Sequence, residues 1–152
     1  MSPVTEHELT LRICNGNKEA EDWMQLMRRY IHVSDDLIDE DIPAAKKLSG
    51  AERMCSMGAL ALRMYSHPFY VKNSNALHAI MLINFAAYTQ SVKWENEEGW
   101  KGVCADWLRH GGIYVLQIIA AICGGYDHMV SFNDELWTLA YDLHHDPEGK
   151  AI

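Results

Sequence analysis

The stretch from Lys18 to Asp41 constrains the fold most strongly, because it contains neither glycine nor proline and its apolar residues recur at three- and four-residue intervals. Those apolar residues are Trp23, Leu26, Met27, Tyr30, Val33, Leu37 and Ile38. This spacing puts one apolar stripe along an α-helix, so it predicts a single amphipathic helix of about six turns. Asn17 can cap its start, and Pro43 ends it.

Further helices are predicted from start and stop signals along the rest of the chain. Serine caps and a capping box mark their starts, whereas proline and paired glycines mark their ends. The predicted ranges are 49–67, 76–95, 99–123 with a break at Gly111-Gly112, and 131–147, beside a weak helix over Leu9–Ile13. The range 76–95 is apolar on nearly every face, which is typical of a helix surrounded by others.

The fold class follows from these helices and from the composition. No segment alternates between polar and apolar residues over a sustained length, so no strand is expected. Forty-nine per cent of the residues are hydrophobic, which is enough for a core without disulfides or a structural metal. We expect an all-α, compact helical bundle of five to six helices, forming a single domain over residues 1–152 with 1–16 and 147–152 at its periphery.

Charge and cysteine content exclude several classes of function. The chain has 13 Lys and Arg against 21 Asp and Glu, a net charge of −8, so nucleic acid is not an expected partner. The four cysteines lie far apart and form no zinc motif. The N-terminus lacks a signal peptide, and the apolar run Ile113–Cys123 is too short to cross a bilayer. We therefore expect a cytoplasmic protein without a membrane partner, and homo-oligomerisation remains open.

The end of the first long helix carries an unusual density of carboxylates. Five of them fall within the segment Asp35-Asp36-Leu37-Ile38-Asp39-Glu40-Asp41. The C-terminus of a helix is the negative end of its dipole, where each acidic side chain costs about 0.3–1 kcal/mol. A divalent cation would relieve this repulsion, and Mg²⁺ is commonly held by one or two carboxylates together with substrate phosphates. We predict a Mg²⁺ or Mn²⁺ site at Asp35, Asp36, Asp39 and Glu40.

This segment resembles the first aspartate-rich motif, DDxxD, of the class I isoprenoid synthases, which make terpenoids and prenyl diphosphates. The resemblance covers roughly a dozen residues. Members of that family are all-α proteins in which the motif binds Mg²⁺ that holds a substrate diphosphate. The resemblance implies that Asp35 and Asp39 are metal ligands and that Asp36 is a supporting carboxylate.

A solvated acidic face would give the same pattern, because Asp35 and Asp39 fall on the side of the helix opposite the apolar stripe, near Arg28 and His32. The sequence leaves these two interpretations open.

Two other places hold candidate functional side chains. Asp106 and His110 lie four residues apart, the spacing at which a carboxylate can orient an imidazole as a general base, and we take them as catalytic candidates. Arg109 beside them and Asn84, alone in the most apolar helix, are candidates for binding substrate. Each also has a structural interpretation, as a group that satisfies a neighbouring helix.

Three functions are compatible with these features. The first is a divalent-metal-dependent helical protein that binds or acts on a diphosphate-containing small molecule. The second is a non-enzymatic acidic accessory protein that binds a protein partner. The third is an all-α nucleoside triphosphate pyrophosphatase of the MazG kind, because Glu19-x-x-Asp22 and Asp36-x-x-Asp39 imitate its paired acidic motifs. Whether the chain is an enzyme is not decided by the sequence.

Overall fold

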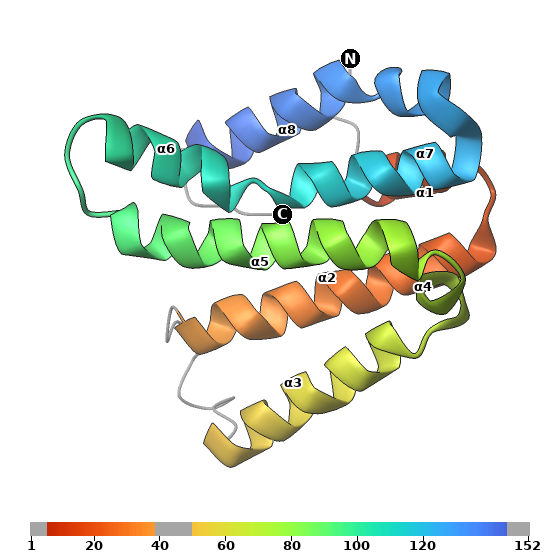
Figure 1. Cartoon of the computed structure of the whole chain (residues 1–152), viewed down its shortest axis with the longest axis horizontal. Helices are drawn as coiled ribbons and strands as arrows, with labels where there is room; N and C mark the ends of the chain where they lie inside the picture. The colour runs from red at the N-terminus through yellow and green to blue at the C-terminus, as the bar shows by residue number, and fades with distance from the viewer. Residues whose placement is uncertain (1–5, 39–49, 146–152) are drawn as a thin grey trace. The chain divides into compact units, whose positions relative to one another are not determined.

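The computed structural model describes residues 6–38 and 50–145, and these residues form eight helices and no strand (Figure 1). The helices are α1 (Glu6–Cys14), α2 (Lys18–Ile38), α3 (Gly50–Tyr65), α4 (Pro68–Lys72), α5 (Ser74–Trp94), α6 (Trp100–Arg109), α7 (Gly112–Val130) and α8 (Asn133–His145). The all-α class is therefore confirmed. The helices of the described residues outnumber the expected five to six, because α4 was not anticipated and the range 99–123 holds two.

The helices group into two compact units along the chain. One unit is Asn17–Lys72 and contains α2, α3 and α4; the other joins Met1–Gly16 to Asn73–Ile152 and contains α1, α5, α6, α7 and α8. We call them the α2–α4 unit and the α5–α8 unit and describe each by itself.

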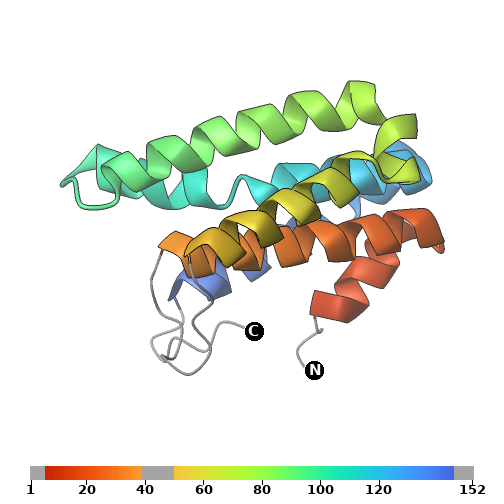
Figure 2. The ribbon, with the colours of Figure 1, turned by 90° about the horizontal axis from the view of Figure 1, so that it is seen from below.

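The α2–α4 unit is organised around Trp23. Asn17 caps α2 as predicted, since its Oδ1 accepts the Ala20 N–H at 3.2 Å. α2 packs along α3, and the two helices lie side by side in both views (Figures 1 and 2). Trp23 is fully buried and donates its indole N–H to the Met64 carbonyl at 3.0 Å. The short helix α4 adds two buried aromatic rings, Phe69 and Tyr70, at 5.8 and 6.0 Å from that indole.

In the α5–α8 unit, α5 packs against α6 and α7, α1 packs against α7, and α7 packs against α8. α5 runs alongside α6 and α7 in both views (Figures 1 and 2). Apolar side chains from every helix of this unit form its core. The contribution of α6 is a single residue, Ala105. The fully buried members of the core include Ile13, Leu77, Val115, Ile119 and Leu136.

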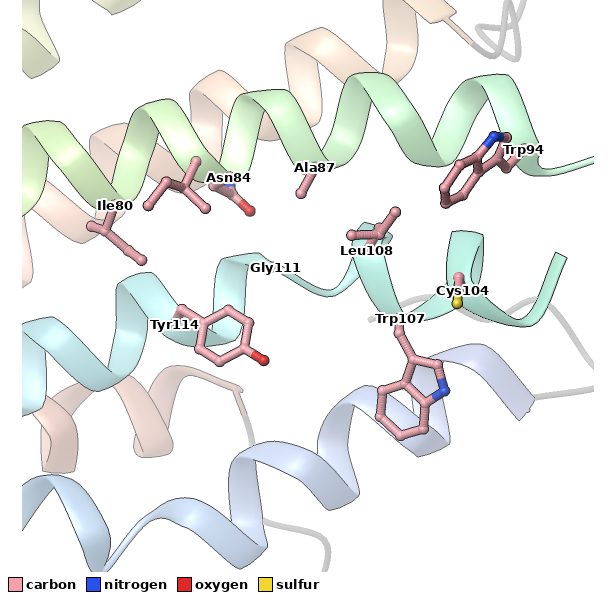
Figure 3. A pocket seen from close by; sticks show the side chains of 10 residues that line it. Ile80, Asn84, Ala87, Trp94, Cys104, Trp107, Leu108, Gly111 and Tyr114 are labelled. Carbon is pink, nitrogen blue, oxygen red and sulfur yellow. The ribbon is translucent and has the colours of Figure 1, made fainter. Parts of the chain in front are cut away.

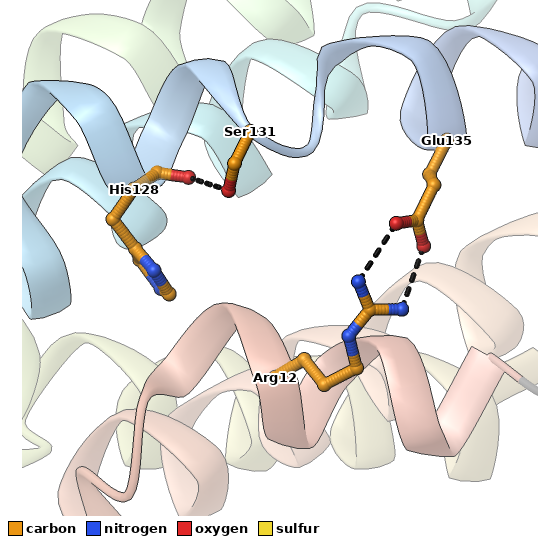
Figure 4. A network of polar contacts seen from close by, with 4 residues as sticks. All are labelled: Arg12, His128, Ser131 and Glu135. Carbon is orange, nitrogen blue, oxygen red and sulfur yellow. Dashed lines mark hydrogen bonds and ion pairs between the residues drawn. The ribbon is translucent and has the colours of Figure 1, made fainter.

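Helix α1 is held to α7 and α8 by polar contacts at its C-terminal end (Figure 4). The Arg12 guanidinium donates two hydrogen bonds to the Glu135 carboxylate, at 2.8 and 2.7 Å, and lies 5.3 Å from the centre of the Phe132 ring. These hydrogen bonds raise the pKa of Arg12 above its ordinary value. His128 Nε2 lies 3.1 Å from the carbonyl oxygen of Ile13. With Leu9, Ile13 and Cys14 buried, α1 belongs to the core of its unit.

Gly124-Gly125 is predicted to stop a helix, and the backbone there is indeed not helical: Gly125 has a φ of 84° and a ψ of −176°, so α7 reaches Val130 only as two helical segments that join at this kink. One predicted boundary does differ from the structure. Ser131 was expected to cap the last helix at its start, but it lies at the C-cap of α7, where its hydroxyl donates to the His128 carbonyl. α8 begins at Asn133 instead. The predicted break at Gly111-Gly112 is confirmed, since α6 ends at Arg109 and α7 starts at Gly112.

One stretch of the described residues, Trp100–Val130, is long and apolar enough to cross a membrane by length and composition, and 22% of its most apolar window is buried. The break before Gly112 and the kink at Gly125 divide this stretch. The uninterrupted part between them rises only about 20 Å, compared with a hydrocarbon core of about 30 Å.

Candidate functional site: an acidic helix end and an uncharged groove

The backbone of Asp35 and Asp36 lies in the last turn of α2, which contains no basic residue. Two of the predicted metal ligands therefore occupy the negative end of a helix dipole, with no cation on the same turn to offset them. Asp39 and Glu40, the other two predicted ligands, lie outside the described residues. One turn earlier, the Arg28 side chain donates a hydrogen bond to His32 Nε2 at 3.4 Å, and both side chains are exposed.

No group of three or more His, Cys, Asp or Glu residues with the geometry of a metal site occurs among the described residues. The side chains from Asp35 to Glu40 are not among those that the structure describes. This finding therefore does not test the predicted metal ligands.

The end of α6 holds three of the residues singled out in the sequence. Asp106 and His110 are both partly buried, and His110 forms the C-cap of α6, where its backbone N–H donates to the Trp107 carbonyl at 3.2 Å. Arg109 is half-exposed and forms an ion pair with Glu95, just beyond the end of α5.

The fourth such residue, Asn84, lies on a groove between α5 and the α6–α7 junction (Figure 3). α5 forms one wall, and the ends of α6 and α7 form the other. Asn84 points from α5 toward Gly111, and a Cβ at position 111 would lie 2.5 Å from Asn84 Oδ1. The absence of a side chain at Gly111 is therefore what lets the carboxamide approach the opposite wall so closely. The predicted helix break and the predicted binding residue thus meet at one place.

The groove has a volume of about 350 Å³ and carries no charged side chain. Its lining residues are Ile80, Ile83, Asn84, Ala87, Trp94, Cys104, Trp107, Leu108, Gly111 and Tyr114. Small-molecule sites in proteins are concave, mostly apolar and aromatic, and contain a few polar groups that orient the ligand. The groove has this composition, with the Asn84 carboxamide as a central polar group.

The aromatic residues of the groove were not singled out from the sequence. Trp94, Trp107 and Tyr114 belong to three different helices and look there like ordinary apolar positions of a bundle. Their helical spacing alone gives no sign that they remain uncovered. The one available signal is the glycine pair after His110, which predicts a gap in the wall without indicating what lies opposite.

The comparisons with known proteins give no further guide. No family model, no curated protein and no solved structure matches this chain.

Proposed function

We propose that this chain is a divalent-metal-dependent helical protein that binds or acts on a diphosphate-containing small molecule. In this proposal Asp35 and Asp39 hold Mg²⁺ or Mn²⁺, and Asp36 and Glu40 support them. The observation that carries it is the course of α2, which runs unbroken to Ile38 and so puts Asp35 and Asp36 in a last turn without a basic residue. Carboxylates in this position are destabilising unless a cation offsets them.

The chemistry suits a phosphorylated ligand. Mg²⁺ is usually bound by few protein carboxylates and completes its coordination with water and phosphate oxygens. Bound in this way, a divalent cation neutralises the phosphate charge and stabilises the oxyanion of a leaving diphosphate. Asp106 and His110 are the candidates for proton transfer, and Arg109 is a candidate for contact with the ligand.

The test is thermal unfolding with and without millimolar Mg²⁺ or Mn²⁺, alone and with inorganic pyrophosphate. A cation that binds the folded state raises the free energy of unfolding by RT ln(1 + [L]/Kd), so the melting temperature should rise. Asp35→Asn combined with Asp39→Asn should abolish this rise while stabilising the metal-free protein by about 0.5–2 kcal/mol. Asp36→Asn should keep part of the metal response.

A matched control lies at the other end of the same helix. Glu19→Gln with Asp22→Asn also removes two acidic groups from α2, but near the positive end of its dipole, and Asp22 there pairs with Lys18 at 3.1 Å. This control should be slightly less stable without metal and should keep the full metal response. A double variant at 35 and 39 that retains the full response would contradict the proposed ligands.

The exposed apolar side chains of α5 and α6 favour a second candidate function, that of an interaction protein. Five of these side chains are more than half exposed: Trp100, Val103 and Trp107 on α6, and Leu82 and Ile83 on α5. A protein partner would cover such side chains. The absence of any melting shift at millimolar metal would favour this function, and light scattering coupled to size exclusion would show whether the partner is a second copy.

The pyrophosphatase alternative has less support. Its paired acidic motifs require two helices that face each other, whereas Glu19, Asp22 and Asp36 all lie on the single helix α2.

A further inference from the structure

We propose that the groove between α5 and the α6–α7 junction binds a neutral, flat, largely apolar molecule whose edge carries neighbouring hydrogen-bond donor and acceptor groups, as a lactam does. This site lies in the α5–α8 unit, whereas the acidic end of α2 lies in the other unit. The inference therefore does not rest on the proposed metal-dependent function, and either can fail alone.

The neutrality of the ligand follows from the lining. All ten residues that line the groove are uncharged, so a charged group inside it would lose its hydration without gaining an ion-pair partner. The nearest charged pair named above, Arg109 with Glu95, is not among the lining residues. At about 350 Å³ the groove is at the small end of the range for ligand pockets, which suits a molecule of one or two rings.

The hydrogen-bonding edge follows from Asn84. Within the part of the chain that the structure describes, its half-buried carboxamide makes no hydrogen bond. A partly desolvated amide in this state gains free energy from any ligand that supplies the missing partners. A carboxamide offers one acceptor and two donors side by side, so it matches an edge that offers a donor next to an acceptor.

The flat shape follows from the aromatic walls. Trp107 and Tyr114 are 58% and 48% exposed, and both contact the ring of Trp137 on α8, with ring centres 5.8 Å apart in each pair. Figure 3 shows the Trp107 ring directed from α6 toward α8, so Trp107 borders the groove rather than facing α5, and both rings remain accessible to solvent. Aromatic rings gain beyond simple burial when another ring stacks on them or meets them edge to face. Trp94, at the C-terminal end of α5, adds a third aromatic residue to the lining.

Cys104 provides a reporter inside the groove. It is partly buried and lines the groove, whereas Cys55 on α3 is exposed and lies in the other unit. Alkylation by iodoacetamide, followed at each cysteine by peptide mass spectrometry, measures occupancy of the groove at Cys104 with Cys55 as the internal reference. The probes are 2-quinolone, which is a two-ring lactam, naphthalene, which has the same shape without the polar edge, and decanol, which is a flexible apolar chain.

We expect 2-quinolone to slow the alkylation of Cys104 and not that of Cys55, at a concentration where naphthalene and decanol protect Cys104 much less. Asn84→Leu should weaken protection by 2-quinolone about tenfold and leave any protection by naphthalene unchanged. Gly111→Ala should act in the same direction, because the added Cβ displaces the carboxamide. Asn75→Leu is the matched control, since it makes the same exchange at an exposed position of α5 outside the groove, and it should change nothing.

Two results would overturn the proposal. Equal protection by all three probes, unaffected by Asn84→Leu, would mean that the groove does not recognise a polar edge. Protection of Cys104 that grows with protein concentration in the absence of any probe would mean that a second copy of the chain covers the groove. Circular dichroism of each variant identifies a loss of protection that comes from unfolding, and the Asn84→Leu and Gly111→Ala variants change opposite walls, so they provide separate tests.

Discussion

At the scale of single residues, Trp23 is the largest fully buried side chain among the residues that the structure describes. It combines complete burial, a hydrogen bond to the Met64 carbonyl and two aromatic neighbours from α4. Trp23→Phe removes the indole N–H, leaves a cavity and reduces the hydrogen bonds of the Met64 carbonyl to the longer one from the His67 N–H at 3.4 Å, so it should lower the free energy of unfolding by about 2–3 kcal/mol. Chemical denaturation measures this loss.

Trp100 is the matched control for this change, because it is 66% exposed. Trp100→Phe should alter the free energy of unfolding by less than about 0.5 kcal/mol. Equal losses for the two variants would show that the core of the α2–α4 unit does not depend on Trp23.

Two phenols, the buried Tyr70 and the partly buried Tyr65, give the protein a pH dependence at the alkaline end. Burial raises the pKa of Tyr65 and of Tyr70, whose rings meet edge to face at 5.0 Å. The folded state therefore holds these protons more tightly than the unfolded chain, whose tyrosines titrate near about 10. The resulting stability is fully present below pH 10 and is lost as pH rises beyond it.

Tyr65→Phe with Tyr70→Phe removes both phenols, so the decline in the free energy of unfolding above pH 10 should become less steep. Urea unfolding at a series of pH values measures the slope. Tyr126→Phe, at an exposed position, should leave the slope as it is in the unaltered protein. A slope that does not change in the double variant would mean that other groups cause the decline.

At the scale of helices, two glycines should respond in opposite ways to alanine. Gly125 forms the kink in α7 with a φ of 84° and a ψ of −176°, a combination that residues with a side chain rarely adopt, so Gly125→Ala should destabilise by about 1–3 kcal/mol. Gly58 lies inside α3 with open space where a Cβ would be, so Gly58→Ala should stabilise by roughly 0.5–1 kcal/mol. Thermal melts compare them directly, and a stabilising Gly125→Ala would mean that the kink is not maintained in solution.

The helices that could be predicted are those whose apolar spacing is sustained. α2, α3 and α5 match their predicted ranges closely, because periodicity over many turns outweighs local ambiguity. α4 has only five residues and offers no periodicity, although both its aromatic side chains are buried. Gly125 interrupts the helical backbone where the glycine pair predicts a stop, but the further helical segment that follows it up to Val130 was not predicted, because its formation depends on packing further along the chain.

The candidate sites were predictable in part for similar reasons. Asn84 stood out as a polar residue in an apolar helix, and the structure puts it on the groove. The aromatic walls could not be foreseen, because spacing identifies an apolar position without telling whether a neighbouring helix covers it. The carboxylates at the end of α2 were noticed only because many acidic residues fall in one short segment. Their role as metal ligands remains a prediction.

At the scale of the whole molecule, the net charge of −8 acts against folding. Compaction brings the excess carboxylates closer together, and the ion pairs of the described residues, such as Arg12 with Glu135 and Lys18 with Glu21, neutralise only some of them. Both pairs are partly exposed to solvent, so each contributes little. Repulsion among the uncompensated carboxylates should therefore dominate the electrostatic part of the stability at neutral pH.

Sodium chloride should stabilise the metal-free protein at pH 7 for this reason. Raising the ionic strength from about 0.01 to 1 M shortens the screening length from about 30 to 3 Å, which weakens the repulsion between carboxylates. The free energy of unfolding, from urea titrations at each salt concentration, should rise by on the order of 1 kcal/mol. At a pH of about 5.4, where the sequence is expected to carry no net charge, the same salt series gives the effect of sodium chloride without net repulsion, that is, its effect on apolar burial and on the ion pairs. The rise at pH 7 should exceed the rise at pH 5.4, and Asp35→Asn with Asp39→Asn should narrow this difference, because it removes two of the repelling groups. A stability that falls with salt at pH 7 would mean that ion pairs outweigh the net charge, and the acidic end of α2 would then have to be compensated within the fold.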